Sequence, residues 1–319
     1  TLATLATLAG CVASWLLADA LIQQFSGRGL VPDTIVNTPQ FALGVAAGAA
    51  FTVFLATCLG LPISTTHALI GALVGAGLGQ VNGEIHFDKL AQSFLLPLLI
   101  SPLIAASLGV VAYKILRARS AAQDCACVVP APPLIIARAN AASVHEFSLP
   151  NIVIAENSAC ENVSVRSRWS ISRALDKLHI ASALSICFAR GLNDTPKLAA
   201  LLLTARFFQH SYSVAVVGGV MALGGILAAR KVAETMSHRI TRLDASQGLA
   251  ANLITAMLVI FASKFGMPVS TTHVSVGSIA GVGASARTLD WQALRNVTLS
   301  WVATLPLAAL VAWGTAQLV

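Results

Sequence analysis

Long apolar runs, separated by short polar connectors, account for most of the chain. Most of these runs are close to the roughly 20 residues that an α-helix needs to cross the hydrocarbon core of a bilayer, and the run at 171–206 is longer. The pattern therefore predicts an all-α polytopic membrane protein. We expect membrane helices within Leu2–Ile22, Phe41–Gly60, Leu90–Leu116, Ile171–Arg206, Val214–Ala229, Gln247–Gly266 and Leu294–Leu318.

A polar segment divides these runs into two groups. Residues 117–170 are rich in Ala, Ser, Asn and Pro, contain five arginines and lack a sustained hydrophobic period. Such a composition is typical of a segment without regular structure. We therefore expect a first membrane repeat in residues 1–116, a poorly ordered cytoplasmic linker in 117–170 and a second membrane repeat in 171–319.

The two halves share one repeated stretch. Gly60–Gly79 reads GLPISTTHALIGALVGAGLG and returns 206 residues later, in Gly266–Ser285, as GMPVSTTHVSVGSIAGVGAS, with nine of the twenty positions identical. A proline-interrupted apolar element in both halves is the best sequence sign of a transporter binding site. We expect each copy to form a re-entrant hairpin, and the pair to build one site.

The charges of two matching connectors indicate how the halves are oriented. Residues 23–40 have no net charge, whereas residues 230–245 contain four basic and two acidic residues. Because basic loops stay on the cytoplasmic side, we expect the two connectors on opposite sides of the membrane. This agrees with an odd number of crossings in each half, five if the elements at 61–82 and 267–288 each count as one net crossing. An odd repeat predicts an inverted topology with broken helices.

The overall composition supports this class of protein. Only 10% of the residues are charged and the mean hydropathy is +0.78, whereas soluble domains contain about 25% charged residues. We expect a multi-pass protein of the inner or plasma membrane, surrounded by the lipid bilayer. The net charge of +7 comes from basic loops and does not indicate a nucleic-acid partner. The six cysteines show no spacing of a zinc site.

The repeated stretch carries the first candidate chemistry. In each copy a proline, which cannot continue the preceding helix, is followed by three hydroxyl residues of the kind that cap helix N-termini. Free backbone N–H groups and the helix dipole make such a terminus suitable for an anion. Two of them together suit a tetrahedral oxyanion, although capping alone would also explain the hydroxyls. The candidate anion-binding residues are Ser64, Thr65, Thr66, Ser270, Thr271 and Thr272.

A histidine follows the hydroxyl residues in each copy, His67 in the first and His273 in the second. A histidine in an apolar segment is more often a structural hydrogen-bond donor than a ligand, so we expect a supporting role at most. A neighbouring serine and histidine also occur in serine hydrolases. No acidic residue follows at a suitable spacing and no Gly-x-Ser-x-Gly motif is present, so we do not expect an enzyme.

A second polar motif interrupts the apolar run 171–206. Gly191 is a typical helix stop, residues 193–195 can cap a new helix, and Pro196 suits the first turn of that helix. We therefore expect two half-helices in this run, with an unwound Asn-Asp pair between them at membrane depth.

The carboxylate of this motif indicates an ion or proton path, because a charged group in the membrane is costly unless it has a function. Asn193, Asp194 and unwound carbonyl groups would form an oxygen site for a small cation, sodium if the coupling ion is sodium. The alternative is that Asp194 only neutralises Lys197 or Arg190. Lys197 is also a candidate supporting residue, together with the two histidines.

These motifs resemble the inorganic phosphate transporter family, over essentially the whole chain outside 117–170. The resemblance rests on the two Pro-[Ile/Val]-Ser-Thr-Thr-His copies and the Gly-x-Asn-Asp-Thr-x-Lys segment. Family members are inverted-repeat secondary carriers that move phosphate, and in some branches sulfate, with sodium or protons. The resemblance implies cation-coupled symport of phosphate, no cofactor, and a homodimer as one option for assembly. It implies anion contacts from Ser64, Thr65, Ser270 and Thr271, and a cation and substrate centre at Asn193 and Asp194.

The chain departs from the family pattern in three ways. The family has a Gly-x-Asn-Asp motif in both halves, and the first would fall 206 residues before Gly191, so we expect the chain to lack its first broken helix. Leu192 and Pro196 stand where small residues are commoner. Asn252 stands where a glutamate is frequent, which leaves the coupling ion open. The alternatives are a sulfate permease of the same family, an anion channel built from half-helices, and a remnant that does not transport.

Overall fold

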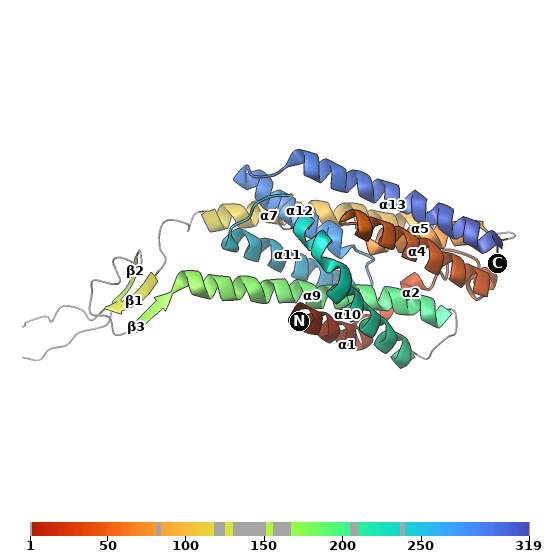
Figure 1. The fold of residues 1–319 in the computed structure, drawn as a ribbon, viewed down its shortest axis with the longest axis horizontal. Helices are drawn as coiled ribbons and strands as arrows, with labels where there is room; N and C mark the ends of the chain where they lie inside the picture. The colour runs from red at the N-terminus through yellow and green to blue at the C-terminus, as the bar shows by residue number, and fades with distance from the viewer. Residues whose placement is uncertain are drawn as a thin grey trace, which may run out of the picture.

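The computed structural model describes residues 2–80, 84–117, 125–129, 151–155, 167–204, 210–236 and 240–318. In Figure 1 the helices form an elongated bundle, and three short strands lie beyond one end of it. The bundle itself consists of helices, which confirms the predicted all-α membrane architecture. The elements before the polar segment are α1 (Leu2–Leu17), α2 (Asp19–Phe25), α3 (Asp33–Val36), α4 (Pro39–Leu59), α5 (Thr65–Leu78), α6 (Phe87–Lys89), the π-helical η1 (Leu90–Leu95) and α7 (Leu96–Arg117). Those after it are α9 (Ile171–Thr204), α10 (His210–Glu234), α11 (Ala245–Lys264), α12 (Thr271–Ala286) and α13 (Trp291–Leu318).

The two halves contain matching helices that pack across the molecule. The helices α4, α5 and α7 of the first half correspond in order to α11, α12 and α13 of the second, and α5 packs along α13 while α12 packs along α7. Glycines make this close contact feasible. A Cβ atom on Gly75 would collide with the carbonyl oxygen of Ala309, and one on Gly281 with that of Ala106. Small residues let helices approach closely in a membrane, so each hairpin helix is held by the other half.

Replacing Gly281 by alanine is expected to destabilise the protein by about 1–3 kcal/mol, because the added methyl group overpacks the contact with α7. The matched control is Gly219→Ala in α10, where a Cβ atom would meet nothing within 4 Å. That change should be neutral or stabilise by up to about 1 kcal/mol, as usual for glycine to alanine within a helix. Thermal unfolding of the purified variants measures both effects. Equal midpoints for the two variants would contradict the close contact.

The first apolar run is broken, whereas the sequence predicted a single membrane helix within Leu2–Ile22. The axes of α1 and α2 differ by 85°. Ala18 leaves helical geometry, and Asp19 begins α2, where a carboxylate is favoured by the positive end of the helix dipole. By length and hydropathy, four helices of the described residues can span a bilayer, or five if α1 and α2 count as one span. Broken helices were expected, and five crossings per half stays a prediction.

The segment that was expected to lack regular structure contains three short strands. β1 (Cys125–Val129) lies between β2 (Asn151–Ala155) and β3 (Ser167–Ser170) and is antiparallel to both. β1 and β2 contain short runs of valine and isoleucine, which favour strands. The prediction used the polar composition of the whole segment and so missed these short runs. The remaining residues of 117–170 lie outside the described part of the chain, so a cytoplasmic linker stays a prediction.

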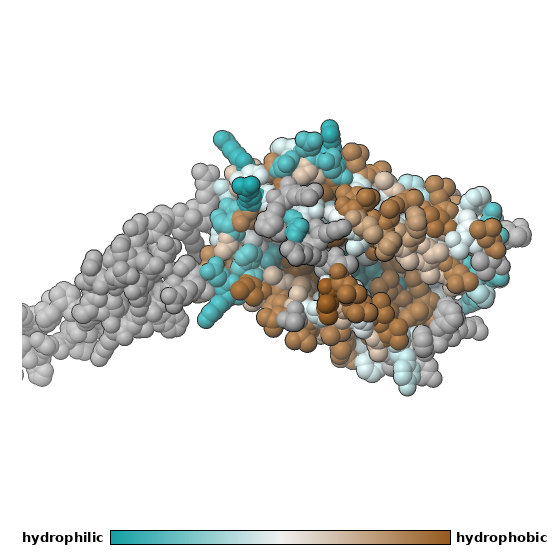
Figure 2. Space-filling view, in the orientation of Figure 1, coloured by the Kyte–Doolittle hydropathy of each residue, from teal (hydrophilic) through white to brown (hydrophobic). Residues whose placement is uncertain are grey.

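Large apolar side chains cover the outside of the helical bundle. Figure 2 shows hydrophobic residues over much of the visible side of its body and hydrophilic residues gathered at the end next to the strands. Leu16 is 79% exposed, Met257 71% and Phe54 70%. Soluble proteins rarely expose apolar surface on this scale, and the same surface is stable against lipid. The chain is a multi-pass membrane protein, as the composition predicted.

Candidate functional site

The two copies of the repeated stretch fold into matching helix starts. Gly60 and Gly266 both adopt a left-handed conformation with φ of 68°, which ends the preceding helix. After the proline, the hydroxyls of Ser64 and Ser270 each accept a hydrogen bond from the backbone N–H three residues later, at 3.0 Å and 3.3 Å. These are N-cap bonds, and they begin α5 and α12 directly after the two serines.

The two helix starts meet inside the bundle. The hydroxyl of Thr66 donates to the carbonyl oxygen of Val269 at 3.2 Å, and the hydroxyl of Thr272 donates to that of Ile63 at 3.0 Å. The two bonds are equivalent under the repeat, since each joins the last threonine of one copy to the residue before the serine of the other. The structure thus brings the two hydroxyl-rich caps into contact, 206 residues apart in sequence.

A cavity of about 580 Å³ lies beside these caps. Thr65, Thr271 and Thr272 line it, and so does Arg190, whose side chain is 51% exposed. Hydroxyl groups and a guanidinium are hydrogen-bond donors that suit an oxyanion. The other three predicted anion-binding residues do not line this cavity, and their buried hydroxyls hold the caps together: Ser64, Thr66 and Ser270.

Arg190 was not predicted to line an anion site, although the sequence contained a signal for it. It precedes Asp194 by four residues, a spacing that places both side chains on one face of a helix. In the structure Arg190 Nε lies 3.7 Å from Asp194 Oδ2. The pair of Arg190 and Asp194 was considered only as mutual neutralisation of charge, so a role of the Arg190 guanidinium at the cavity was missed.

The prediction of two half-helices in 171–206 is wrong. α9 is one helix that runs without interruption through Gly191 and the Asn-Asp pair. Gly191 serves a close helix crossing, because a Cβ atom there would collide with the carbonyl oxygen of Thr7 in α1. Pro196 lies inside the helix, and membrane helices tolerate proline because neighbouring groups compensate for the lost hydrogen bond. The unwound carbonyl groups that were expected as cation ligands are therefore not present in α9.

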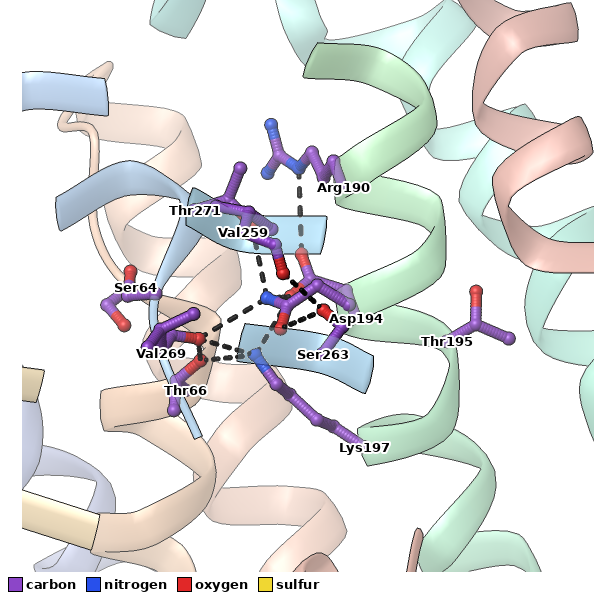
Figure 3. A network of polar contacts seen from close by, with 12 residues as sticks. Ser64, Thr66, Arg190, Asp194, Thr195, Lys197, Val259, Ser263, Val269 and Thr271 are labelled. Atoms are coloured by element: carbon purple, nitrogen blue, oxygen red, sulfur yellow. Dashed lines mark hydrogen bonds and ion pairs between the residues drawn. The ribbon is translucent and has the colours of Figure 1, made fainter. Parts of the chain in front are cut away.

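Asn193 and Asp194 nevertheless lie beside the cap of the second copy, and Figure 3 shows Asp194 in this network near Val269 and Thr271. The Asn193 amide group donates to Thr271 Oγ1 at 3.2 Å and to the Val269 carbonyl at 3.3 Å, while its oxygen accepts from Ser263 Oγ at 3.1 Å. This side chain is completely buried. It therefore connects α9 directly to a threonine of the cavity.

Lys197, predicted only as a supporting residue, lies at the centre of this network. Its ammonium donates to Thr66 Oγ1 and to the Val269 carbonyl, both at 2.8 Å, and to Asp194 Oδ1 at 3.4 Å. Figure 3 shows the Lys197 side chain extending from α9 toward Thr66 of the first cap, while Thr195 points away from the network. The lysine is fully buried. An ion pair within α9 was the alternative to a cation site, and the structure contains that pair.

The two histidines form a packed pair that does not line the cavity. The rings of His67 and His273 lie 4.4 Å apart between centroids, and His273 also packs on Trp301 at 3.8 Å. The Trp301 indole donates to the Pro62 carbonyl at 2.9 Å, which fixes the turn before the first cap. These contacts indicate that the two histidines have a structural role in packing behind the caps.

Asn252, where the resemblance would favour a glutamate, lines the same cavity as the cap threonines. Its amide group donates to Ser182 Oγ at 3.1 Å. The side chain is neutral, so the cavity wall formed by α11 carries no carboxylate at this position.

Comparisons with known proteins agree with this architecture. A family model described as "Phosphate transporter family" matches residues 1–312. A protein of Pyrococcus horikoshii named as a phosphate permease is 26% identical over 89% of this chain and 80% of its own length. A protein of Rhizobium meliloti named as a low-affinity inorganic phosphate transporter is 28% identical over 89% of this chain and 75% of its own.

A solved structure shares the fold. It is described as the sodium-dependent phosphate transporter, superposes with a TM-score of 0.74 and is 21% identical in sequence. The match covers 99% of this chain and 88% of that one. At this identity the likeness establishes the arrangement of helices.

Proposed function

Since the chain belongs to the phosphate transporter family, we propose that it moves inorganic phosphate across the membrane together with a cation, sodium or a proton. The observation that carries this proposal is the meeting of the two caps. Their reciprocal bonds through Thr66 and Thr272 join the halves beside one cavity lined by cap threonines and a guanidinium. The solved relative is described as sodium-dependent, which supports sodium as a candidate coupling ion.

Phosphate would bind in the cavity against the threonine hydroxyls and Arg190. Hydrogen bonds to an ionised group are stronger than neutral ones, and a guanidinium can bind two phosphate oxygens at once. The N-termini of α5 and α12 add positive potential on the same side. Ser64, Thr66 and Ser270 would act indirectly, because they hold the two helix starts in place.

Asn193 and Asp194 are proposed as the centre that transmits the effect of the coupled cation to the anion site. Asn193 donates to Thr271, which lines the cavity, so a change at the centre reaches the anion site through one hydrogen bond. A cation that moves with a phosphate dianion offsets charge that the membrane would otherwise disfavour. Alternating access would come from movement of the bundle that contains α5 and α12 relative to the remaining helices.

Uptake of labelled phosphate by proteoliposomes tests this function. We expect saturable uptake that requires a sodium or a proton gradient and persists in excess sulfate. Loss of uptake in excess sulfate would favour a sulfate permease, because sulfate has nearly the same shape. Flux that neither saturates nor depends on any gradient would instead indicate a channel.

A further inference from the structure

The ammonium of Lys197 has the surroundings of a bound metal cation. Its three ligands are a hydroxyl, a carbonyl and a carboxylate oxygen, from Thr66, Val269 and Asp194. Hard oxygen atoms of these kinds are the usual ligands of small metal ions in proteins. Thr66 belongs to the first half of the chain and the other two to the second, so one positive charge connects both halves.

The three oxygen atoms around the ammonium are already engaged in these contacts. An ammonium has three N–H donors, and all three are used. The Val269 carbonyl has two lone pairs and already accepts from three donors, at 2.8, 3.2 and 3.3 Å. The ring of Phe25 lies 5.7 Å below the ammonium and closes another side with a favourable cation–π contact.

The charges around Asp194 also disfavour a sodium ion at this place. Asp194 already has two positive partners, Lys197 at 3.4 Å and Arg190 at 3.7 Å. A sodium ion at these oxygens would lie within a few ångströms of a buried unit charge of the same sign, where repulsion is strong. Sodium and the Lys197 ammonium therefore exclude one another from the same place.

We propose that Lys197 is the resident cation of the Asn193–Asp194 centre and that it excludes sodium from this centre. This inference deepens the proposed function, on which it rests, and it determines which ions the centre accepts. The positive charge that holds the two caps together stays with the protein. Sodium that the carrier couples to must then bind at other residues.

The test compares sodium chloride with choline chloride on the purified full chain, with unfolding temperature and phosphate affinity as readouts. Lys197→Asn removes the ammonium and frees the oxygens around it. We expect this variant to gain a sodium-dependent rise in unfolding temperature and a phosphate affinity about five-fold or more higher in sodium, a typical coupling between two sites. The double variant Lys197→Asn/Asp194→Asn should lose both gains. The exposed Lys264→Asn is the matched control and should behave as the wild type.

Two results would overturn the proposal. One is a folded Lys197→Asn variant that responds to sodium no more than the wild type. The other is a sodium-dependent rise in the unfolding temperature of the wild type that Asn193→Ala abolishes, and this measurement does not depend on how well the lysine variant folds. A wild type that binds no phosphate in either salt would contradict the proposed function, while the unfolding temperatures would still decide the role of Lys197.

Discussion

The Asp194→Asn variant is expected to lose about 3–5 kcal/mol of stability, the usual cost of leaving one member of a buried ion pair without its partner. Lys197 is fully buried, and Arg190, the other charge near Asp194, is also positive and cannot neutralise it. The double variant Asp194→Asn/Lys197→Met should recover most of the loss, because it removes both charges. Chemical or thermal unfolding of the purified variants measures the difference as a double-mutant cycle.

The control for this cycle is Asp176→Asn, an exposed acidic residue on the same helix, which should change stability by less than about 0.5 kcal/mol. Phosphate uptake should be absent in both Asp194 variants, so stability and transport would respond differently to the second substitution. An Asp194→Asn protein as stable as the wild type would contradict the ion pair.

The starts of the two hairpin helices could be predicted from the sequence because their causes are local. A glycine in the left-handed region, a proline and a capping serine act within a few residues of one another. The duplication of this string then indicated that the two starts belong to one site. The structure adds that the last threonine of each copy, Thr66 or Thr272, makes the contact across the halves.

The course of α9 could not be predicted in the same way because its cause is not local. Gly191 and Pro196 have the sequence pattern of a helix end, yet Gly191 is explained by the backbone of α1 packed against it. α1 is more than 170 residues away in the chain. A motif of helix-breaking residues thus has two readings in a membrane protein, and only the packing partner distinguishes them.

The role of Lys197 was also out of reach of the sequence. Its ligands Thr66 and Val269 come from the two copies of the repeat, and they surround the ammonium only after the copies have met. The sequence did show that Lys197 is close enough to Asp194 in the chain to neutralise it. Whether that pair was a neutralised ion pair or a site for a foreign cation depended on the oxygens around it.

The double variant Thr65→Val/Thr271→Val is expected to raise the dissociation constant for phosphate by about 100-fold or more. A hydrogen bond to a charged group contributes about 1.5–3 kcal/mol, and each 1.4 kcal/mol corresponds to a factor of ten. Both threonines line the cavity, and valine has nearly the same shape, so the substitution leaves the volume unchanged. It removes two hydroxyl donors and, at Thr271, also the acceptor of the Asn193 hydrogen bond. Isothermal titration of the purified variants with phosphate measures the effect.

Thr57→Val is the matched control, because Thr57 lines the same cavity but its hydroxyl donates to the Val53 carbonyl of its own helix at 2.8 Å. It should therefore bind phosphate with nearly the affinity of the wild type. An equal loss of phosphate affinity in Thr57→Val would show that the effect comes from the polarity of the cavity as a whole. Normal binding by the double variant would remove the caps from the anion site, and the meeting of the two helix starts would then have a purely structural purpose.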